Sequence, residues 1–444
     1  MRKLLYTVAL FVTASACSTK PESKPYNWED DLHQRLLTDF CMTESQVKDY
    51  IRKYIPDVTD EQMRQWEASK ALECMMLDGE KRYFRNAGPN LFRVDSTCYD
   101  IKIAKEGTSP SGSEKVNMEN LPEIISAVKK EGKAIVEPKR MRVTYTLTVD
   151  TNAVPAGKII RCWLPYPRQD QARQQDVKFI SASEPQYTFS SPECRHSTLY
   201  MEKRAVEGEP TVFSETFEFT ANGEWHNLKP EDVQPYDTTT ALYKEYTAER
   251  EKHIVFSPRL RELAAKLTVG ETNPYLKAKR IFRWVNDNFP WASAREYSTI
   301  ENIPEYVLDN RHGDCGQVSL LFITLCRISG IPAHFQSGFI MHPRAWNLHD
   351  WAEVYFEGVG WVPVDQSFGI PAFACNADEE YFFLGGIDSW RMIVNTDYGM
   401  PLQPEKQYPR SETVDFQRGE VEWEGGNLYF PQWDYHMDID YLNY

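Results

Sequence analysis

Apolar residues recur at helical spacing in the segment RHGDCGQVSLLFITLCRISGI, residues 311–331. The apolar positions lie three or four residues apart, at Val318, Leu321, Phe322, Leu325 and Ile328. This spacing gives a helix one continuous apolar face for burial. The pattern stops at Gly330 and Pro332, because glycine favours a helix end and proline cannot continue a helix. We therefore predict a mostly buried helix that begins at Cys315.

Helical spacing also predominates in the N-terminal region, residues 30–135. One predicted helix there carries a methionine-rich face formed by Met63, Trp66, Leu72, Met75 and Met76. Because methionine fills irregular gaps in protein cores, we expect this face to be buried rather than to bind a partner. A further helix is predicted over about residues 121–131, after a loop at 105–115. The pattern assigns no chemistry to this region.

Apolar and polar residues alternate in a central segment, which predicts strands. In MRVTYTLTVD (residues 141–150), the apolar side is formed by Val143, Tyr145, Leu147 and Val149. Residues 158–165 and 211–220 continue the alternation. Strands at this spacing predict a β-sandwich domain over residues 136–236.

Helical patterns return at residues 258–267 and 273–288, within a segment (237–405) that also contains the helix at Cys315. The remaining residues, 406–444, form an acidic and aromatic C-terminal extension. In it Glu420, Glu422 and Glu424 alternate with Val421 and Trp423, which predicts an edge strand. Its aromatic stretch at 427–435 could line a sugar or peptide cleft, although covering the core is the favoured interpretation. Helices and strands thus fall in separate segments, so we predict an α+β fold.

The first residues have the pattern of a secretory leader. Arg2 and Lys3 precede an apolar run at residues 4–12, which is too short to span a membrane. Cys17 follows the Ala14-x-Ala16 sequence and has two interpretations. It is the lipidated first residue of a bacterial lipoprotein, which its position resembles, or it lies beyond an ordinary signal-peptidase site. We favour the lipoprotein, with a signal peptide at 1–16 and a polar tether at 17–29.

The net charge and the predicted export limit the kinds of molecule that the protein is expected to bind. The chain of 444 residues has a net charge of −15, which argues against nucleic acid and against a basic membrane-binding face. We therefore expect membrane contact only through a lipid anchor at Cys17. An exported lipoprotein would face the periplasm or the cell surface, where a protein or peptide is the expected substrate.

Nine cysteines do not form an even disulfide framework. Without Cys17 and Cys315, seven remain, so at least one more is free or intermolecular. Cys162 and Cys194 could pair within the β domain. The spacing of Cys41, Cys74 and Cys98 is not that of metal ligands, and the acidic run 378–380 lacks the alternation of a calcium loop. We expect neither a metal nor another cofactor.

Three residues have the types and order needed for nucleophilic catalysis. Cys315 lies at the predicted helix start, where free N–H groups and the helix dipole favour the thiolate. His349 begins the strand-like stretch at 348–356, and Asp365 ends a second one, WVPVD. A nucleophilic cysteine needs a base, and the base needs a carboxylate that orients it. If a hairpin pairs odd residues with odd residues, His349 and Asp365 share one face.

The sequences GDCGQ, RISGIPA, HDWAEVYF and GWVPVD resemble those of the transglutaminase-like superfamily, most densely over residues 277–369. The resemblance implies a papain-like catalytic domain, here at 237–405. It further implies that Cys315 is the nucleophile, His349 the general base and acid, and Asp365 the orienting carboxylate. A β domain before the catalytic domain also resembles the arrangement in many bacterial members.

The expected reaction is acyl transfer on amide bonds through a thioester on Cys315. Hydrolysis by a cysteine peptidase or amidase is favoured, because the resemblance is to peptidase-like bacterial proteins. A cross-linking transglutaminase is the alternative within the same chemistry. A non-catalytic lipoprotein that binds glycans or proteins is the alternative of another class. The oxyanion would be held by the Cys315 N–H and a second donor, for which Trp291 and Tyr297 are candidates that also fit plain packing.

Overall fold

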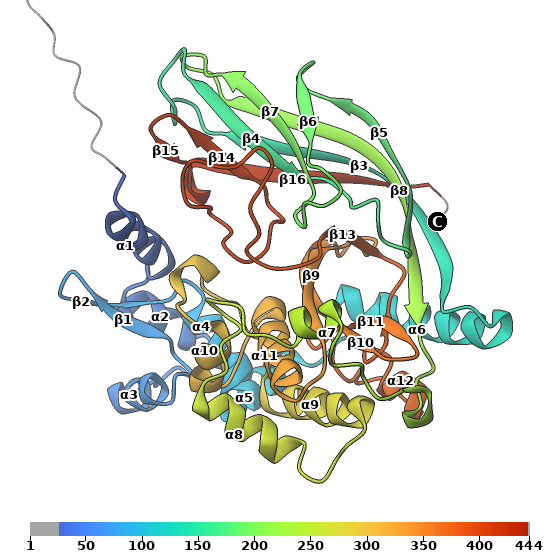
Figure 1. The fold of residues 1–444 in the computed structure, drawn as a ribbon. Helices are drawn as coiled ribbons and strands as arrows, with labels where there is room; N and C mark the ends of the chain where they lie inside the picture. The colour runs from blue at the N-terminus through green and yellow to red at the C-terminus, as the bar shows by residue number, and fades with distance from the viewer. Residues whose placement is uncertain (1–25, 443–444) are drawn as a thin grey trace, which may run out of the picture.

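The computed structural model describes residues 26–442 (Figure 1). The predicted signal peptide, Cys17 and most of the tether therefore lie outside the described residues. Two five-stranded sheets form the upper part of Figure 1, above a body of helices packed on a four-stranded sheet, which confirms the α+β class. No helix between residues 26 and 442 is long and apolar enough to cross a membrane.

The N-terminal region is mostly helical, as predicted. Its helices are α1 (Trp28–Asp39), α2 (Glu44–Ile51), α3 (Asp60–Ala68), α4 (Ala87–Val94), α5 (Ser96–Glu106) and α6 (Gly112–Glu131). The helix predicted at 121–131 is the second half of α6, which starts earlier because Ser111 and Glu114 form a capping box.

The prediction of a methionine-rich helix is only partly confirmed. Met63 and Trp66 lie on α3 with their side chains buried, but α3 ends at Ala68. Met75 and Met76 instead belong to β1 (Cys74–Leu77), which pairs with β2 (Glu80–Tyr83). Asp78 and Gly79, with φ of 51° and 78°, form the two-residue turn between them. A turn of this kind matches the twist of a hairpin, and here strand pairing overrides the helical spacing.

Two sheets pack face to face around one hydrophobic core, as the alternating pattern predicts. One sheet has the order β12-β8-β3-β16, with β5 also paired to β8, and the other the order β15-β14-β4-β7-β6. Val143, Tyr145, Leu147 and Val149 are all buried in this core. The strands from the central segment are β3 (Ile135–Val149), β4 (Ile159–Pro165), β5 (Gln174–Ala182), β6 (Tyr187–Phe189), β7 (Thr198–Arg204) and β8 (Thr211–Trp225).

The C-terminal residues return to these sheets as β14 (Glu420–Trp423), β15 (Gly426–Asn427) and β16 (Trp433–Tyr441). The predicted strand at Glu420 is confirmed, but it is not an edge, because β14 lies between β4 and β15. The carboxylates of Glu420 and Glu422 are buried and paired with Lys406 and Arg161. Glu420 and Glu422 are therefore internal ion-pair partners, whereas the Glu424 side chain is exposed.

The lower body contains the helix at Cys315. This helix, α11 (Cys315–Ile328), contacts α8, α9 and α10 and packs on β9 and β10. Its sheet has the order β11-β10-β9-β13. The predicted helices at 258–267 and 273–288 are confirmed as α8 and α9. The elements are α7 (Ala241–Tyr246), α8 (Pro258–Leu267), α9 (Pro274–Asn288), α10 (Ile303–Asn310), β9 (Ala333–Ile340), β10 (Asn347–Phe356), β11 (Gly360–Val364), α12 (Ala377–Glu380), β12 (Gly386–Ile387) and β13 (Arg391–Asn395).

Cysteine pairing does not follow the sequence expectation. Cys162 is buried on β4, whereas Cys194 lies in a loop and donates to the carbonyl oxygen of His196 at 3.2 Å. Both are free thiols, so the suggested disulfide between them is wrong. Cys326 is buried on α11 as a core residue.

The sandwich core gives the first testable prediction. Phe217 is fully buried between the sheets, whereas Phe189 of β6 is 37% exposed. We expect Phe217→Ala to lower the free energy of unfolding by about 3–5 kcal/mol, because it removes a buried ring and leaves a cavity. The matched control Phe189→Ala should cost about 1 kcal/mol. Urea unfolding measures both, and equal losses would contradict this assignment of the core.

Candidate active site

Cys315 occupies the first position of α11, as the sequence predicts. Asp314 is the N-cap: its side chain accepts a hydrogen bond from the Gln317 N–H at 3.1 Å, and the Gln317 amide oxygen accepts one from the Asp314 N–H at 3.2 Å. Every residue from Gly316 to Arg327 is buried, while Cys315 stays partly exposed. The thiol is therefore held where a fixed helix meets the surface of a cavity.

The Cys315 thiol faces a carboxyl group. It donates a hydrogen bond to Oδ2 of Asp350 at 3.5 Å. Burial raises the pKa of the thiol well above its usual value, and Asp350 and Asp314 act in the same direction. The prediction that the helix start favours the thiolate is therefore wrong for the resting site. The main reason is the burial of the thiol; the carboxyl group of Asp350, which faces the sulfur, and that of Asp314, which caps the first turn, add to it.

His349 and Asp365 are brought together as the sequence predicts. Nε2 of His349 lies 2.8 Å from Oδ2 of Asp365. The hairpin of β10 and β11 pairs odd residues with odd residues, for example Glu353 with Pro363, so both side chains share a face. Burial lowers the pKa of His349, and the opposing effect of Asp365 does not restore it, so the neutral base form is favoured.

At the start of β10, the neighbouring residues His349 and Asp350 point to opposite faces of the strand. Side chains alternate along a strand, so Asp350 faces α11 and Cys315, whereas His349 points to the opposite face with Trp351. Between residues 26 and 442, no hydrogen bond joins the Cys315 thiol to the His349 ring. The structure thus joins two of the three predicted site residues and places the third beside Asp350.

A buried arginine completes the environment of Asp365. Arg391 of β13 donates from Nη2 to Oδ2 of Asp365 at 2.9 Å and from Nε to Oδ2 of Asp388 at 2.7 Å. His342 lies 3.1 Å from the other oxygen of Asp388. Burial alone would raise the pKa of Asp365, but its interactions with His349 and Arg391 outweigh this effect and hold the pKa below its usual value. Asp365 is therefore an anion that fixes the His349 ring.

A cavity of about 180 Å³ opens beside Cys315. Its walls come from four parts of the chain: residues 291–297, which lead into η2 (Tyr297–Thr299), the start of α11, the start of β10, and a segment that precedes β14. We call the last of these the 411–418 loop. The residues of this loop that line the cavity are Ser411, Glu412, Asp415, Gln417 and Arg418.

The 411–418 loop fixes the start of β10. Nε2 of Gln417 donates to the carbonyl oxygen of His349 at 2.8 Å and to Oδ1 of Asp350 at 2.9 Å. The two acceptors belong to His349, the predicted base, and to Asp350, the partner of the Cys315 thiol. Gln417 therefore positions the backbone of His349 and the carboxyl group of Asp350 together.

The two candidates for a second oxyanion donor differ. The Tyr297 hydroxyl donates to Oδ1 of Asp314 at 2.6 Å, so its proton already serves the N-cap of α11. A Cβ atom at Gly316 would lie 2.6 Å from Oδ2 of Asp350 and would also collide with the Tyr297 hydroxyl, so only glycine fits this close approach. Trp291 lines the cavity and is 45% exposed. Of the two, Trp291 is the one with a side chain open to a bound molecule.

Sequence reasoning missed several residues of this site. Asp350 and Arg391 each interrupt an apolar strand, LHDWAEVYF and RMIVN, and a charged residue at such a position was the available signal. Gln417 and Asp415 lie in an irregular segment that carries no comparable signal. Their contribution depends on the path of the loop.

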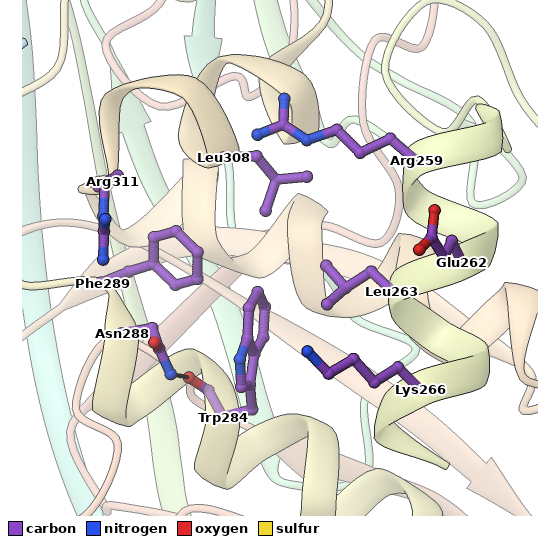
Figure 2. Close-up of a pocket in the computed structure, with 9 residues that line it drawn as sticks. All are labelled: Arg259, Glu262, Leu263, Lys266, Trp284, Asn288, Phe289, Leu308 and Arg311. Carbon is purple, nitrogen blue, oxygen red and sulfur yellow. Dashed lines mark hydrogen bonds between the residues drawn. The ribbon is translucent and has the colours of Figure 1, made fainter. Parts of the chain in front are cut away.

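A second cavity, of about 410 Å³, lies between α8, α9 and α10 (Figure 2). Leu263, Trp284, Phe289 and Leu308 form its apolar floor, and Arg259 and Lys266 lie at its rim. None of its nine lining residues is a cysteine, histidine or aspartate. It therefore lacks the residue types of the site beside Cys315.

A comparison with known protein families agrees with the location of the candidate site at Cys315, His349 and Asp365. Residues 261–366 match the family model described as the Transglutaminase-like superfamily, and they form a transglutaminase-like core domain that contains Cys315, His349 and Asp365. A segment of 129 residues is 28% identical to the uncharacterized protein YebA of Bacillus subtilis (strain 168). That match covers 25% of this chain and only 18% of YebA.

The solved structures that this chain matches are distant in sequence, and their overall structural agreement with it is low. A proposed cysteine protease from Cytophaga hutchinsonii is 15% identical with a TM-score of 0.47, and the alignment covers 70% of this chain and 93% of that one. The periplasmic domain of TgpA from Pseudomonas aeruginosa is 13% identical with a TM-score of 0.27, covering 51% of this chain and 88% of that domain.

The Arg391 network predicts an unusual response to pH. Asp365 and Asp388 have a lowered pKa in the folded protein, so their contribution to stability is present above about pH 4 and is lost on further acidification. Arg391→Met leaves both carboxylates buried without their cation. We expect it to lower the free energy of unfolding by about 3–5 kcal/mol at neutral pH. Part of this loss should be recovered toward about pH 5, because buried unpaired carboxyl groups bind protons more readily than unfolded ones.

Urea unfolding at both pH values measures this effect. The matched control is Arg283→Met, which removes a half-exposed arginine paired with Asp287 and Glu380 and should change stability little. A loss in Arg391→Met that stays constant with pH would contradict the role given to its charge.

Proposed function

We propose that the protein is a thiol-dependent acyl transferase that hydrolyses peptide or amide bonds, with Cys315 as nucleophile. The observation that carries this proposal is the buried His349–Asp365 pair. His349 lies on β10, and β10 packs against α11, the buried helix that begins at Cys315. The transglutaminase-like core domain at residues 261–366 supports the same chemistry.

The reaction follows from the roles of these groups. His349 takes the proton of the Cys315 thiol, and the sulfur attacks the carbonyl carbon of the amide. The carbon–nitrogen bond breaks, the amine leaves with the proton returned by His349, and a thioester remains on Cys315. Water then attacks the thioester and releases the carboxylic acid. An amine in place of water would give transamidation instead.

The resting geometry sets a requirement for this mechanism. Nε2 of His349 is bound to Asp365, so Nδ1 is the nitrogen left to accept the thiol proton. The thiol is hydrogen-bonded to Asp350, and His349 lies on the other face of β10, so the thiol must leave Asp350 and the start of β10 must rearrange before proton transfer. Asp350 therefore holds the nucleophile in a protonated, inactive arrangement until substrate enters.

Alkylation by iodoacetamide across pH tests these roles. We expect Cys315 to react selectively, His349→Ala to slow the reaction at neutral pH, and Asp350→Asn to accelerate it about tenfold by lowering the thiol pKa. Cys315→Ala identifies the signal, and Asp440→Asn is the charge-matched control on an exposed position of β16. Loss of reactivity in Asp350→Asn together with no effect of His349→Ala would make Asp350 the base and overturn the triad. No selective reaction at Cys315 would favour a binding protein.

We also propose that the protein is exported and anchored through a lipid on Cys17. The leader, the position of Cys17 and the polar tether support this proposal. Fractionation of expressing cells should place the full chain in the membrane and Cys17→Ala in the soluble fraction. Equal membrane association of the two forms would contradict the anchor.

A further inference from the structure

The cavity beside Cys315 contains more carboxyl groups than cations. Five of its lining residues are acidic: Glu296, Asp314, Asp350, Glu412 and Asp415. Arg418 pairs with Glu296 at 2.8 Å and with Glu412 at 2.7 Å, so its charge is shared by those two residues. Arg295, the other lining arginine, has its ion pair with Glu73, outside the cavity lining.

Three of the acidic residues form no ion pair among the described residues. Asp314 has a structural task, since it caps α11 and accepts a hydrogen bond from Tyr297. Asp350 accepts hydrogen bonds from the neutral groups of Gln417 and Cys315. Asp415 has no hydrogen-bond partner of this kind between residues 26 and 442. The cavity therefore holds two carboxyl groups, Asp350 and Asp415, that form no ion pair within that range.

Asp415 is the clearest case. It is 8% exposed and lines the cavity, yet within residues 26–442 no donor reaches its carboxyl oxygens. Arg410 is nearby but donates to the backbone carbonyl of Asp415, and its ion pair is with Glu420. A buried polar group without a partner is costly, and such groups in folded proteins call for an explanation.

A cationic ligand bound to Asp415 would remove the free-energy cost of leaving its carboxyl group without a partner. Burial raises the pKa of Asp415 and of Asp350 well above the usual value, and a neighbouring carboxyl group raises each further, Glu412 for Asp415 and Asp415 for Asp350. The opposing charges of Arg418 and Arg410 do not cancel this effect at Asp415. Both therefore tend to hold protons in the empty cavity. A primary ammonium group brings one positive charge and three N–H donors in a compact shape, and it would favour the ionised form of both acids.

We propose that the cavity beside Cys315 recognises a primary ammonium group of the substrate, held between the carboxyl groups of Asp350 and Asp415. This inference rests on the proposed function, since it takes Cys315 as the nucleophile. The substrates it selects are peptides that carry a lysine-like side chain or a free amino terminus next to the bond that acylates Cys315. Binding of the ammonium to Asp350 would also draw that carboxyl group away from the thiol and free the nucleophile.

Charged thiol reagents test the proposal on the full chain. The cationic reagent is 2-aminoethyl methanethiosulfonate and its anionic counterpart is the 2-sulfonatoethyl compound. In each, the thiolate attacks the sulfenyl sulfur, a mixed disulfide forms and methanesulfinate leaves. Mass spectrometry gives the rate at each cysteine, and the exposed Cys41 is the internal reference.

We expect the cation-to-anion rate ratio at Cys315 to exceed that at Cys41 by roughly tenfold or more. Asp415→Asn should reduce this preference several-fold, whereas the charge-matched control Asp440→Asn should leave it unchanged. The preference should grow with pH as Asp350 and Asp415 ionise. The other charged groups that face them, Glu296, Asp314, Glu412, Arg410 and Arg418, stay the same in every variant.

Equal ratios at Cys315 and Cys41, or a preference that Asp415→Asn leaves intact, would overturn the proposal. If iodoacetamide still labels Cys315 in a manner that depends on His349, the proposed function survives that failure. If no reagent modifies Cys315, the proposed function fails and this inference fails with it.

Protection of Cys315 from iodoacetamide distinguishes the two sources of the ammonium. Nα-acetyl-lysine amide carries a side-chain ammonium, alaninamide carries an α-ammonium, and Nα-acetyl-norleucine amide is the neutral control. Protection by the first alone assigns a lysine-like side chain, and protection by the second alone assigns a free amino terminus. Protection by neither cation, or equal protection by the neutral amide, would contradict recognition of an ammonium.

Discussion

The burial of α11 along its length is the constraint on which the rest of the site depends. Helices on one side and the four-stranded sheet on the other enclose every residue from Gly316 to Arg327. A helix packed in this way cannot shift without opening a cavity in the core. Its first residue, Cys315, is consequently presented at one fixed point, and the neighbouring strands determine which groups it meets.

The two faces of β10 handle charge in opposite ways. On one face Arg391 binds both Asp365 and Asp388, and Asp365 also binds His349, so both carboxylates of this network have a cationic partner. On the other face Asp350 meets a thiol and an amide, and no cation neutralises it among the described residues. The paired Asp365 orients the proposed base His349, whereas Asp350, which has no ion-pair partner among the described residues, is one of the two carboxyl groups on which the proposed ammonium recognition rests. The same strand thus holds the proposed base on one face and, on the other, the carboxyl group beside the Cys315 thiol.

The β-sandwich contributes to the site through its connection to the sheet below. The segment between β13 and β14 is anchored at one end in the four-stranded sheet and at the other in the sandwich. This segment contains the 411–418 loop, which forms a wall of the cavity and holds the start of β10 through Gln417. The strands that follow it complete both sheets of the sandwich. Sheet pairing far from Cys315 therefore determines the shape of the cavity beside it.

The sequence by itself determined the features that arise from local patterns. The spacing of apolar residues predicted α11, α8, α9 and four strands of the sandwich, β3, β4, β8 and β14. The odd positions of His349 and Asp365 placed them on one face of a hairpin. Such patterns reflect the period of a helix or strand and need no distant contact. Only the tertiary structure decided that Asp350 faces the thiol, that Arg391 binds Asp365, and that Asp415 has no ion-pair partner among the residues described. Contacts such as Arg391–Asp365 and Gln417–Asp350 join residues 26 and 67 positions apart, and nothing in a local pattern encodes which distant residues will meet.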